Sequence, residues 1–134
     1  MMRIMQPKAL PRPTDAELAI LRVLWASGPC TVRDVQQQLQ DQRPDTGYTT
    51  VLKLLQIMTE KGLVTRDESA RSHVYHARRS EAVTQRQLVT DLLDRAFGGS
   101  AAQLVLQALS VAPASPEELK TIRQLLDDTR GERR

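Results

Sequence analysis

The spacing of apolar residues between positions 14 and 78 is the feature that most constrains the fold of this chain. Three successive segments repeat apolar residues at helical intervals, and the segment after them changes to short runs that are typical of strands. Aromatic residues make up only 3% of the chain, so the core has to be built mainly from aliphatic side chains. The pattern predicts a mainly α fold with a small β-hairpin.

Capping residues mark the first two helices. Residues 14–17, Thr-Asp-Ala-Glu, have the form of a capping box, in which a threonine hydroxyl and a glutamate satisfy backbone amides at the start of a helix. Leucines then recur at helical spacing until residues 27–29, Ser-Gly-Pro, end the run. Thr31 is expected to cap a second, shorter helix, and its buried side is predicted to be Val32, Val35 and Leu39.

A third helix is predicted over residues 46–61, closed by Gly62. Its inward side follows the i, i+3, i+4, i+7 pattern with Val51, Leu54, Leu55 and Met58. The two β-prone runs that follow, at 63–68 and 73–78, flank a polar tip and outline a hairpin. A helix-turn-helix followed directly by a two-stranded hairpin is the winged-helix arrangement.

The outward side of residues 46–61 is suited to the major groove of DNA. It is short, polar and free of acidic residues until Glu60, so a helix N-terminus there can approach the bases and phosphates closely. Threonine can donate to a phosphate or a base edge, and its methyl group can contact the thymine methyl. The predicted DNA-binding residues are Thr46, Gly47, Tyr48, Thr49, Thr50, Lys53, Gln56 and, at the hairpin tip, Arg71.

Taken singly, these residues have ordinary structural interpretations. Thr46 could be only a helix cap, and Arg71 could be solvated surface charge. Tyr75, in the second hairpin run, is expected in the core rather than at a contact. The joint arrangement of the predicted DNA-binding residues favours DNA as the partner, and so does the distribution of charge along the chain. Residues 1–79 hold 12 Lys and Arg against 8 Asp and Glu, whereas residues 80–134 hold 7 against 8.

The sequence offers no pattern of a metal, cofactor or catalytic site. His73 and His76 lie three apart on a predicted strand and therefore point to opposite faces, and Cys30 is the only cysteine. A phosphate-cradling glycine loop is also missing from the sequence. We therefore expect a protein that is not an enzyme and needs no metal or cofactor. Because no run approaches a signal peptide or a membrane span, we expect it in the cytoplasm, without a membrane partner.

The last part of the chain, residues 80–134, returns to helical periodicity and is too short to bury its apolar side alone. A second copy of the chain is the most economical partner, which makes this region a predicted helical dimerisation element beside a winged-helix domain at 14–79 and a flexible arm at 1–13. The predicted dimerisation residues are Leu88, Leu92, Leu93, Phe97, Leu104, Leu109, Leu119, Ile122, Leu125 and Leu126.

Three stretches, TDAELAILRVLWASGPCTVRDV, YTTVLKLLQIMTEKGLVTRDE and RSHVYHA in this order, resemble the BlaI/MecI/CopY family of penicillinase-type repressors. The resemblance runs from about Pro13 to Asp128. It implies a homodimeric winged-helix repressor of double-stranded palindromic operators upstream of β-lactamase or related resistance or stress genes. It also implies a regulatory sensor or protease as a further partner.

The chain departs from the family pattern at two places. Penicillin-responsive members are cleaved at an Asn-Phe bond in the C-terminal region, whereas the aligned residues 106–109 read Leu-Gln-Ala-Leu, with Gln107 and Ala108 in place of the pair. Copper-responsive members carry a C-terminal cysteine cluster, and this chain has none. The inducing signal, the operator and the regulated genes therefore stay open.

An alternative from another class is a winged-helix module that binds a protein instead of DNA. That function would need apolar anchor residues on the outward side of the third helix. Thr49, Thr50, Lys53 and Gln56 are poor anchors, so DNA is the favoured partner.

Overall fold

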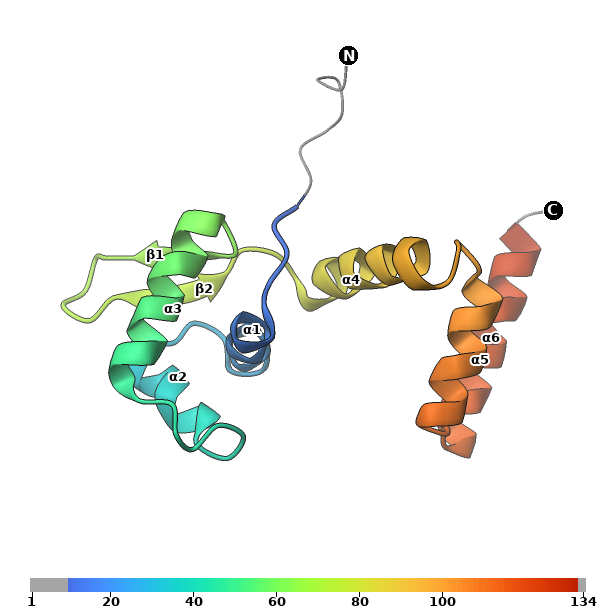
Figure 1. The fold of residues 1–134 in the computed structure, drawn as a ribbon, viewed down its shortest axis with the longest axis horizontal. Helices are drawn as coiled ribbons and strands as arrows, with labels where there is room; N and C mark the ends of the chain where they lie inside the picture. Colours follow the sequence, from blue (N-terminus) through green and yellow to red (C-terminus); the bar gives the residue numbers. More distant parts are fainter. Residues whose placement is uncertain (1–9, 133–134) are drawn as a thin grey trace, which may run out of the picture. The chain divides into compact units, whose positions relative to one another are not determined.

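The computed structural model of the chain describes residues 10–132, with side chains to residue 129, as six helices and one two-stranded sheet (Figure 1). The chain divides between Val89 and Thr90, inside the fourth helix, into two compact units. The elements, in chain order, are α1 (Asp15–Ser27), α2 (Val32–Leu39), α3 (Tyr48–Lys61), β1 (Val64–Asp67), β2 (Val74–Ala77), α4 (Glu81–Ala96), α5 (Ala101–Val111) and α6 (Pro116–Glu132).

The predicted caps of α1 and α2 are confirmed. The Thr14 hydroxyl accepts from the Glu17 amide at 3.2 Å, and the Glu17 carboxylate accepts from the Thr14 amide at 2.9 Å. Thr31 and Asp34 form the same reciprocal pair at the start of α2. Helix α1 ends at Gly28, whose φ of 83° lies in the left-handed region that glycine adopts without steric cost.

Helix α3 begins two residues later than its sequence pattern predicts. Gly47 is the N-cap, and the preceding Thr46 amide donates to the carbonyl of Arg43 at 3.1 Å, so Thr46 belongs to the turn after α2. The end of α3 is as expected, because Gly62 takes a left-handed conformation with φ of 82°. Leu54 is only half-buried, although the spacing of apolar residues predicts it on the inward side of the helix.

The core of the first unit is formed jointly by α1, α2, α3 and the hairpin, which gives the predicted winged helix. Side chains from all of these elements are less than 2% exposed. They are Ile20 of α1, Val35 and Leu39 of α2, Val51, Leu55 and Met58 of α3, Val64 of β1 and Tyr75 of β2. The expectation that Tyr75 is a core residue is confirmed.

The hairpin is attached to the helices by its backbone as well as by its side chains. β1 and β2 pair antiparallel, from Val64 opposite Ala77 to Asp67 opposite Val74. The Tyr75 amide also donates to the Cys30 carbonyl at 2.8 Å, and the Cys30 amide donates back at 3.1 Å. The segment between α1 and α2 thus fixes the outer edge of β2.

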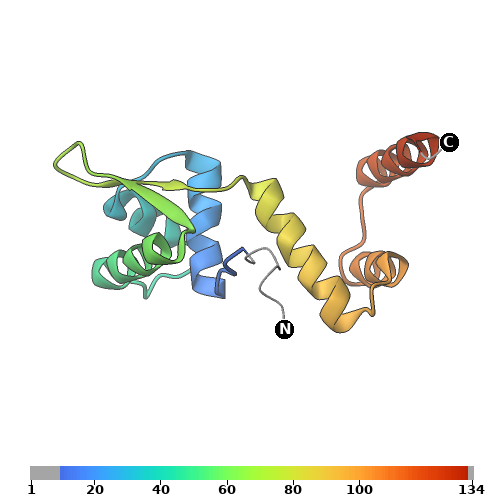
Figure 2. The ribbon, with the colours of Figure 1, turned by 90° about the horizontal axis from the view of Figure 1, so that it is seen from above.

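The second unit buries none of its described side chains. From residue 85 to residue 129 every side chain is exposed or half-buried. Figure 2 shows α5 and α6 as two separate helices joined by a short connection. Helix α6 begins with a capping box, in which Ser115 and Glu118 exchange hydrogen bonds of 2.9 and 3.1 Å. No helix between residues 10 and 132 combines the length and hydropathy of a membrane span.

A largely buried ion pair joins the start of α1 to the end of α3. Nζ of Lys61 lies 2.7 Å from Oε1 of Glu17, whose side chain is 3% exposed against 32% for that of Lys61. Burial by itself would raise the pKa of Glu17, but the hydrogen bonds from Lys61 and Thr14 outweigh it and hold the pKa below its ordinary value of 4.5. The pair therefore stabilises the folded state only while Glu17 is ionised.

We expect Lys61→Met to lower the free energy of unfolding at pH 7 by about 1–2 kcal/mol, a value reduced from that of a fully buried pair because Lys61 is partly exposed. Because the pKa of Glu17 is lower in the folded state, the stabilisation is present above the unfolded-state pKa and is lost as pH falls through the folded-state pKa. Urea denaturation should therefore show a difference from the natural chain that is largest at neutral pH and shrinks in acid. Lys53→Met, on the exposed side of the same helix, is the control, and an equal loss in both variants would contradict this assignment.

Candidate nucleic-acid interface

Helix α3 presents two chemically different sides. Val51, Leu55 and Met58 are fully buried, at 0% exposure. The opposite side is exposed along the helix, and its residues are Tyr48, Thr49, Thr50, Lys53 and Gln56. The five predicted contact residues that lie within α3 are thus all accessible.

The N-terminus of α3 has no side chain that competes for its amides. Gly47 makes no side-chain cap, and the first turn contains no acidic residue. The positive end of the helix dipole and the unpaired amides therefore favour an anion. A Cβ at Gly47 would meet nothing within 4 Å, so local packing does not require glycine there. The missing side chain instead leaves the approach to the helix end open.

A groove of about 370 Å³ runs between the start of α2, the start of α3 and the wing. It brings together two predicted residues that are far apart in sequence, Tyr48 of α3 and Arg71 of the hairpin tip. Its lining contains no acidic residue. It consists of Thr31, Val32, Arg33, Tyr48, Leu52, Arg71, Ser72, His73 and Tyr75.

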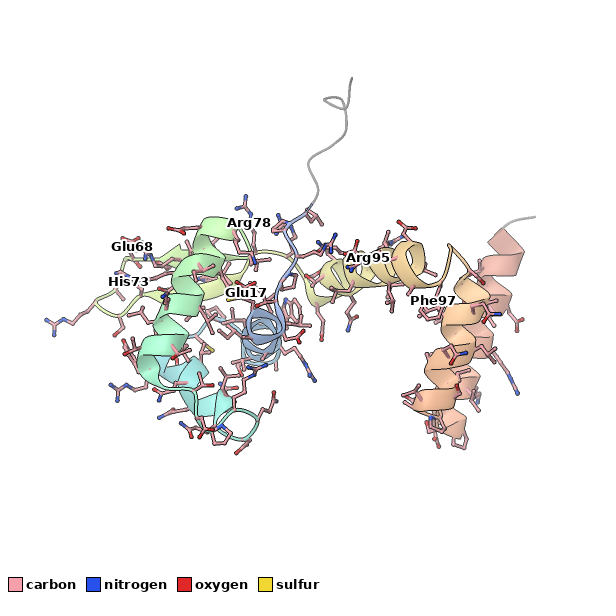
Figure 3. All side chains as sticks on the ribbon, in the orientation of Figure 1. Glu17, Glu68, His73, Arg78, Arg95 and Phe97 are labelled. Carbon is pink, nitrogen blue, oxygen red and sulfur yellow. The ribbon has the colours of Figure 1, made fainter. Side chains whose placement is uncertain are left out.

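Sequence reasoning did not assign Arg33 and His73 to this surface. Arg33 lies on the water-facing side of α2, and only the folded module brings it to the same groove as the wing. His73, labelled in Figure 3, precedes β2 and lines the groove as well. The usable signal was that Arg33 lies two residues after the Thr31 cap, in the first turn of α2.

The charged residues of the wing differ in whether they have partners. Arg66 pairs with Glu68 at 2.6 Å, and this hydrogen bond raises the pKa of Arg66. The Ser69 amide donates to Asp67 at 2.9 Å, which lowers the pKa of that carboxyl. Among the described residues, Arg71 has neither an ion pair nor a hydrogen bond, and its side chain is exposed. It remains available for an external anion.

The two histidines of the wing open onto different hollows. His73 lines the groove beside α3, whereas His76 lines a separate hollow beside Trp25 of α1. In the part of the chain that the structure describes, no three His, Cys, Asp or Glu residues gather closely enough to bind a metal ion. The exposed side of α3 and the basic groove offer hydroxyl and cationic side chains, which are groups suited to an anion.

Proteins of known identity resemble this chain in sequence. The penicillinase repressor from Bacillus licheniformis is 25% identical over 130 residues, which is 95% of this chain and 98% of that protein. The transcriptional regulator BlaI from Mycobacterium tuberculosis is 40% identical over 67 residues, which is 49% of this chain and 48% of that protein. The solution structure of the DNA-binding domain of the repressor BlaI aligns with 24% identity and a TM-score of 0.49, covering 56% of this chain and 90% of that one.

The family model described as penicillinase repressor matches residues 13–128. This range is nearly the one over which the sequence motifs showed their resemblance, from about Pro13 to Asp128, and the resemblance is confirmed. Because the match extends over both the winged helix and the C-terminal helices, the chain belongs to the penicillinase repressor family.

Proposed function

We propose that the protein is a dimeric transcriptional repressor that blocks a promoter by binding an inverted repeat in double-stranded DNA. Its family is one of transcriptional repressors, which supports DNA as the partner. The observation that carries the proposal is the continuity of the exposed side of α3, which is free of acidic residues up to Glu60, with the basic groove between α2 and the wing. A protein-binding module would need apolar anchors on that side, and among the exposed residues of α3 only Tyr48 and Ile57 are large and apolar, at 45% and 37% exposure.

In this proposal α3 enters the major groove with its N-terminus first. Thr49, Thr50 and Gln56 are then close to base edges, while Lys53 can reach a guanine or a phosphate. One sugar-phosphate strand follows the groove between α2 and the wing, where Arg33 and Arg71 approach it from opposite sides. Thr46 and Gly47, which lie just before α3, contribute their backbone and short side chains to the same approach.

The second half of the proposal is the homodimer. The helices after Val89 expose large apolar side chains that a soluble chain normally covers, including Leu126 at 62% and Leu106 at 57% exposure. A second copy offers the same surface and buries both by two-fold symmetry. Such symmetry would place two copies of α3 on half-sites about one helical turn apart, which requires a palindromic operator.

The proposal also covers the regulated genes and the signal that releases the protein from DNA. The Bacillus licheniformis relative is named for repression of penicillinase, so we propose β-lactamase or related resistance or stress genes as targets. We also propose a regulatory sensor or protease as a further partner of the protein. The bond between Gln107 and Ala108 lies inside α5, so a protease would have to unwind that helix before cutting there.

The direct test is gel retardation of a palindromic fragment from the region upstream of the protein's own gene, in an excess of random DNA. We expect a retarded complex that survives the competitor, because base contacts from α3 add to the phosphate contacts. If random DNA removes the complex as readily as the unlabelled fragment does, sequence-specific repression is refuted.

Three cationic side chains should each account for about one phosphate contact. We expect Lys53→Ala, Arg71→Ala and Arg33→Ala to weaken binding and to reduce the slope of log K against log salt by about 0.9 each. Arg22→Ala, an exposed arginine of α1 outside the groove, is the matched control. If the slope of log K against log salt stays unchanged in all three variants, the assignment of these side chains to phosphate contacts is wrong.

Sedimentation of the intact chain at micromolar concentration should give the mass of a dimer. Leu126→Asp should shift the equilibrium towards monomer by about tenfold or more, because it would bury an unpaired carboxylate in the interface. Asp127→Asn alters the charge at the neighbouring exposed position of α6 and should leave the mass unchanged. A monomeric natural chain would refute the dimer.

A further inference from the structure

Three consecutive carbonyls just before α1 accept hydrogen bonds from two later helices. Nε2 of Gln87, on α4, donates to the carbonyls of residues 10 and 11 at 2.9 and 3.1 Å. Nζ of Lys61, at the end of α3, donates to the carbonyl of Arg12 at 3.2 Å. We call residues 10–13 the strap. The sequence pattern assigned them to a flexible arm, of which residues 1–9 lie outside the described part of the chain.

The composition of the strap suits this bonding. Pro11 and Pro13 have no amide hydrogen and fix their own φ, and each disfavours helix for the residue before it. The segment therefore loses little conformational entropy when it is held extended, and it cannot pair as an ordinary strand. Its carbonyls are left for side chains such as those of Gln87 and Lys61.

The far end of the strap is fixed by the capping box of α1. Oε1 of Glu17 accepts from the Thr14 amide and also from Lys61, at 2.9 and 2.7 Å. Figure 3 labels Glu17 on α1, where the incoming segment reaches the helix. The strap thus extends from a buried ionic junction to the side chain of Gln87 on α4.

The start of α4 is held at a separate point. Nε1 of Trp25 donates to the Arg79 carbonyl at 3.0 Å, and the Arg79 guanidinium donates to the Gly62 carbonyl at 2.9 Å. Thr84, in the first turn, is 5% exposed. Gln87 lies six residues after Glu81, or about 9 Å along the axis, so its bonds to the strap attach α4 at a second point, distant from the first.

We propose that Gln87 is a positioning residue that, through the strap, holds the first half of α4, residues 81–89, in one direction relative to α3. This effect on the helix concerns the first unit alone. Its consequence for DNA rests on the proposed function, since α4 leads into the dimerisation region. We expect a fixed first half of α4 to narrow the range of half-site spacings that a dimer can span, because it removes one source of freedom between α3 and the dimerisation region.

The test compares four full-length proteins. Gln87→Glu keeps the shape of the side chain but replaces the donor by a carboxylate that repels carbonyls. Gln87→Lys restores a donor at the same position. Gln85→Glu, at an exposed position on the same helix, controls for the added charge. The natural chain is the reference.

Residual dipolar couplings of amides 81–89 report the direction of α4 without DNA. We expect these amides to share one alignment with α1–α3 in the natural chain, in Gln85→Glu and in Gln87→Lys. In Gln87→Glu their couplings should be scaled down relative to those of α1–α3. Equal couplings in Gln87→Glu and the natural chain would overturn the inference, whether or not the protein binds DNA.

The second readout is the ratio of affinities for duplexes whose half-sites are at the preferred spacing and one or two base pairs away from it. Gln87→Glu should lose about fivefold to tenfold of this preference, the scale of two lost hydrogen bonds, and Gln87→Lys should regain most of it. An unchanged preference in Gln87→Glu would overturn the spacing consequence. If the natural chain shows no spacing preference, the proposed operator model fails, and the couplings alone decide whether the strap positions α4.

Discussion

The packing of α3 through Val51, Leu55 and Met58 determines which of its side chains can reach another molecule. These three side chains are fully buried against α1, α2 and the hairpin, and they fix the rotation of α3 about its own axis. With that rotation fixed, the threonines, Lys53 and Gln56 have to face solvent. A turn of the helix by about 100°, the angle of one residue, would bury polar groups without partners and expose apolar ones, which is costly in both directions. The packing of the core thus determines which side of α3 is exposed.

The two units differ in how much of their own apolar surface they bury. The winged helix encloses side chains from three helices and both strands, and two backbone hydrogen bonds attach the hairpin to Cys30. The helices after Val89 have good caps, at Ser100 and Ser115, but bury none of their described side chains. Caps determine where such helices begin, whereas most of the stability of a helix comes from the packing of its apolar side. This division fits a module that reads DNA and a region that assembles two such modules.

Much of the fold was predictable because its signals are local. The capping boxes at Thr14, Thr31 and Ser115, the left-handed Gly62 and the change of period at the hairpin each lie within a few residues of the feature that they specify. The start of α3 was misplaced by two residues because the Thr46 amide is bonded to the turn after α2. Helix propensity carries no information about that bond.

The features that sequence reasoning missed depend on residues that are distant in the chain. Arg33 and His73 line one groove only after α2 and the wing have packed on the same core. Glu17 and Lys61 are 44 positions apart, and Gln87 is 77 positions from its acceptor at Leu10. The pattern of residues 80–97 does indicate an amphipathic helix. It cannot indicate that Gln87 on this helix donates hydrogen bonds to the proline-rich strap near the N-terminus.

In the proposed complex, two copies of α3 lie in the major groove of one operator. Hydroxyl-radical footprinting of the full chain on its upstream fragment tests this arrangement, because it maps the protected sugars of both strands. We expect two protected windows related by the operator's symmetry, with centres about one helical turn apart on one face of the duplex. A single window, or protection spread evenly along the fragment, would contradict it.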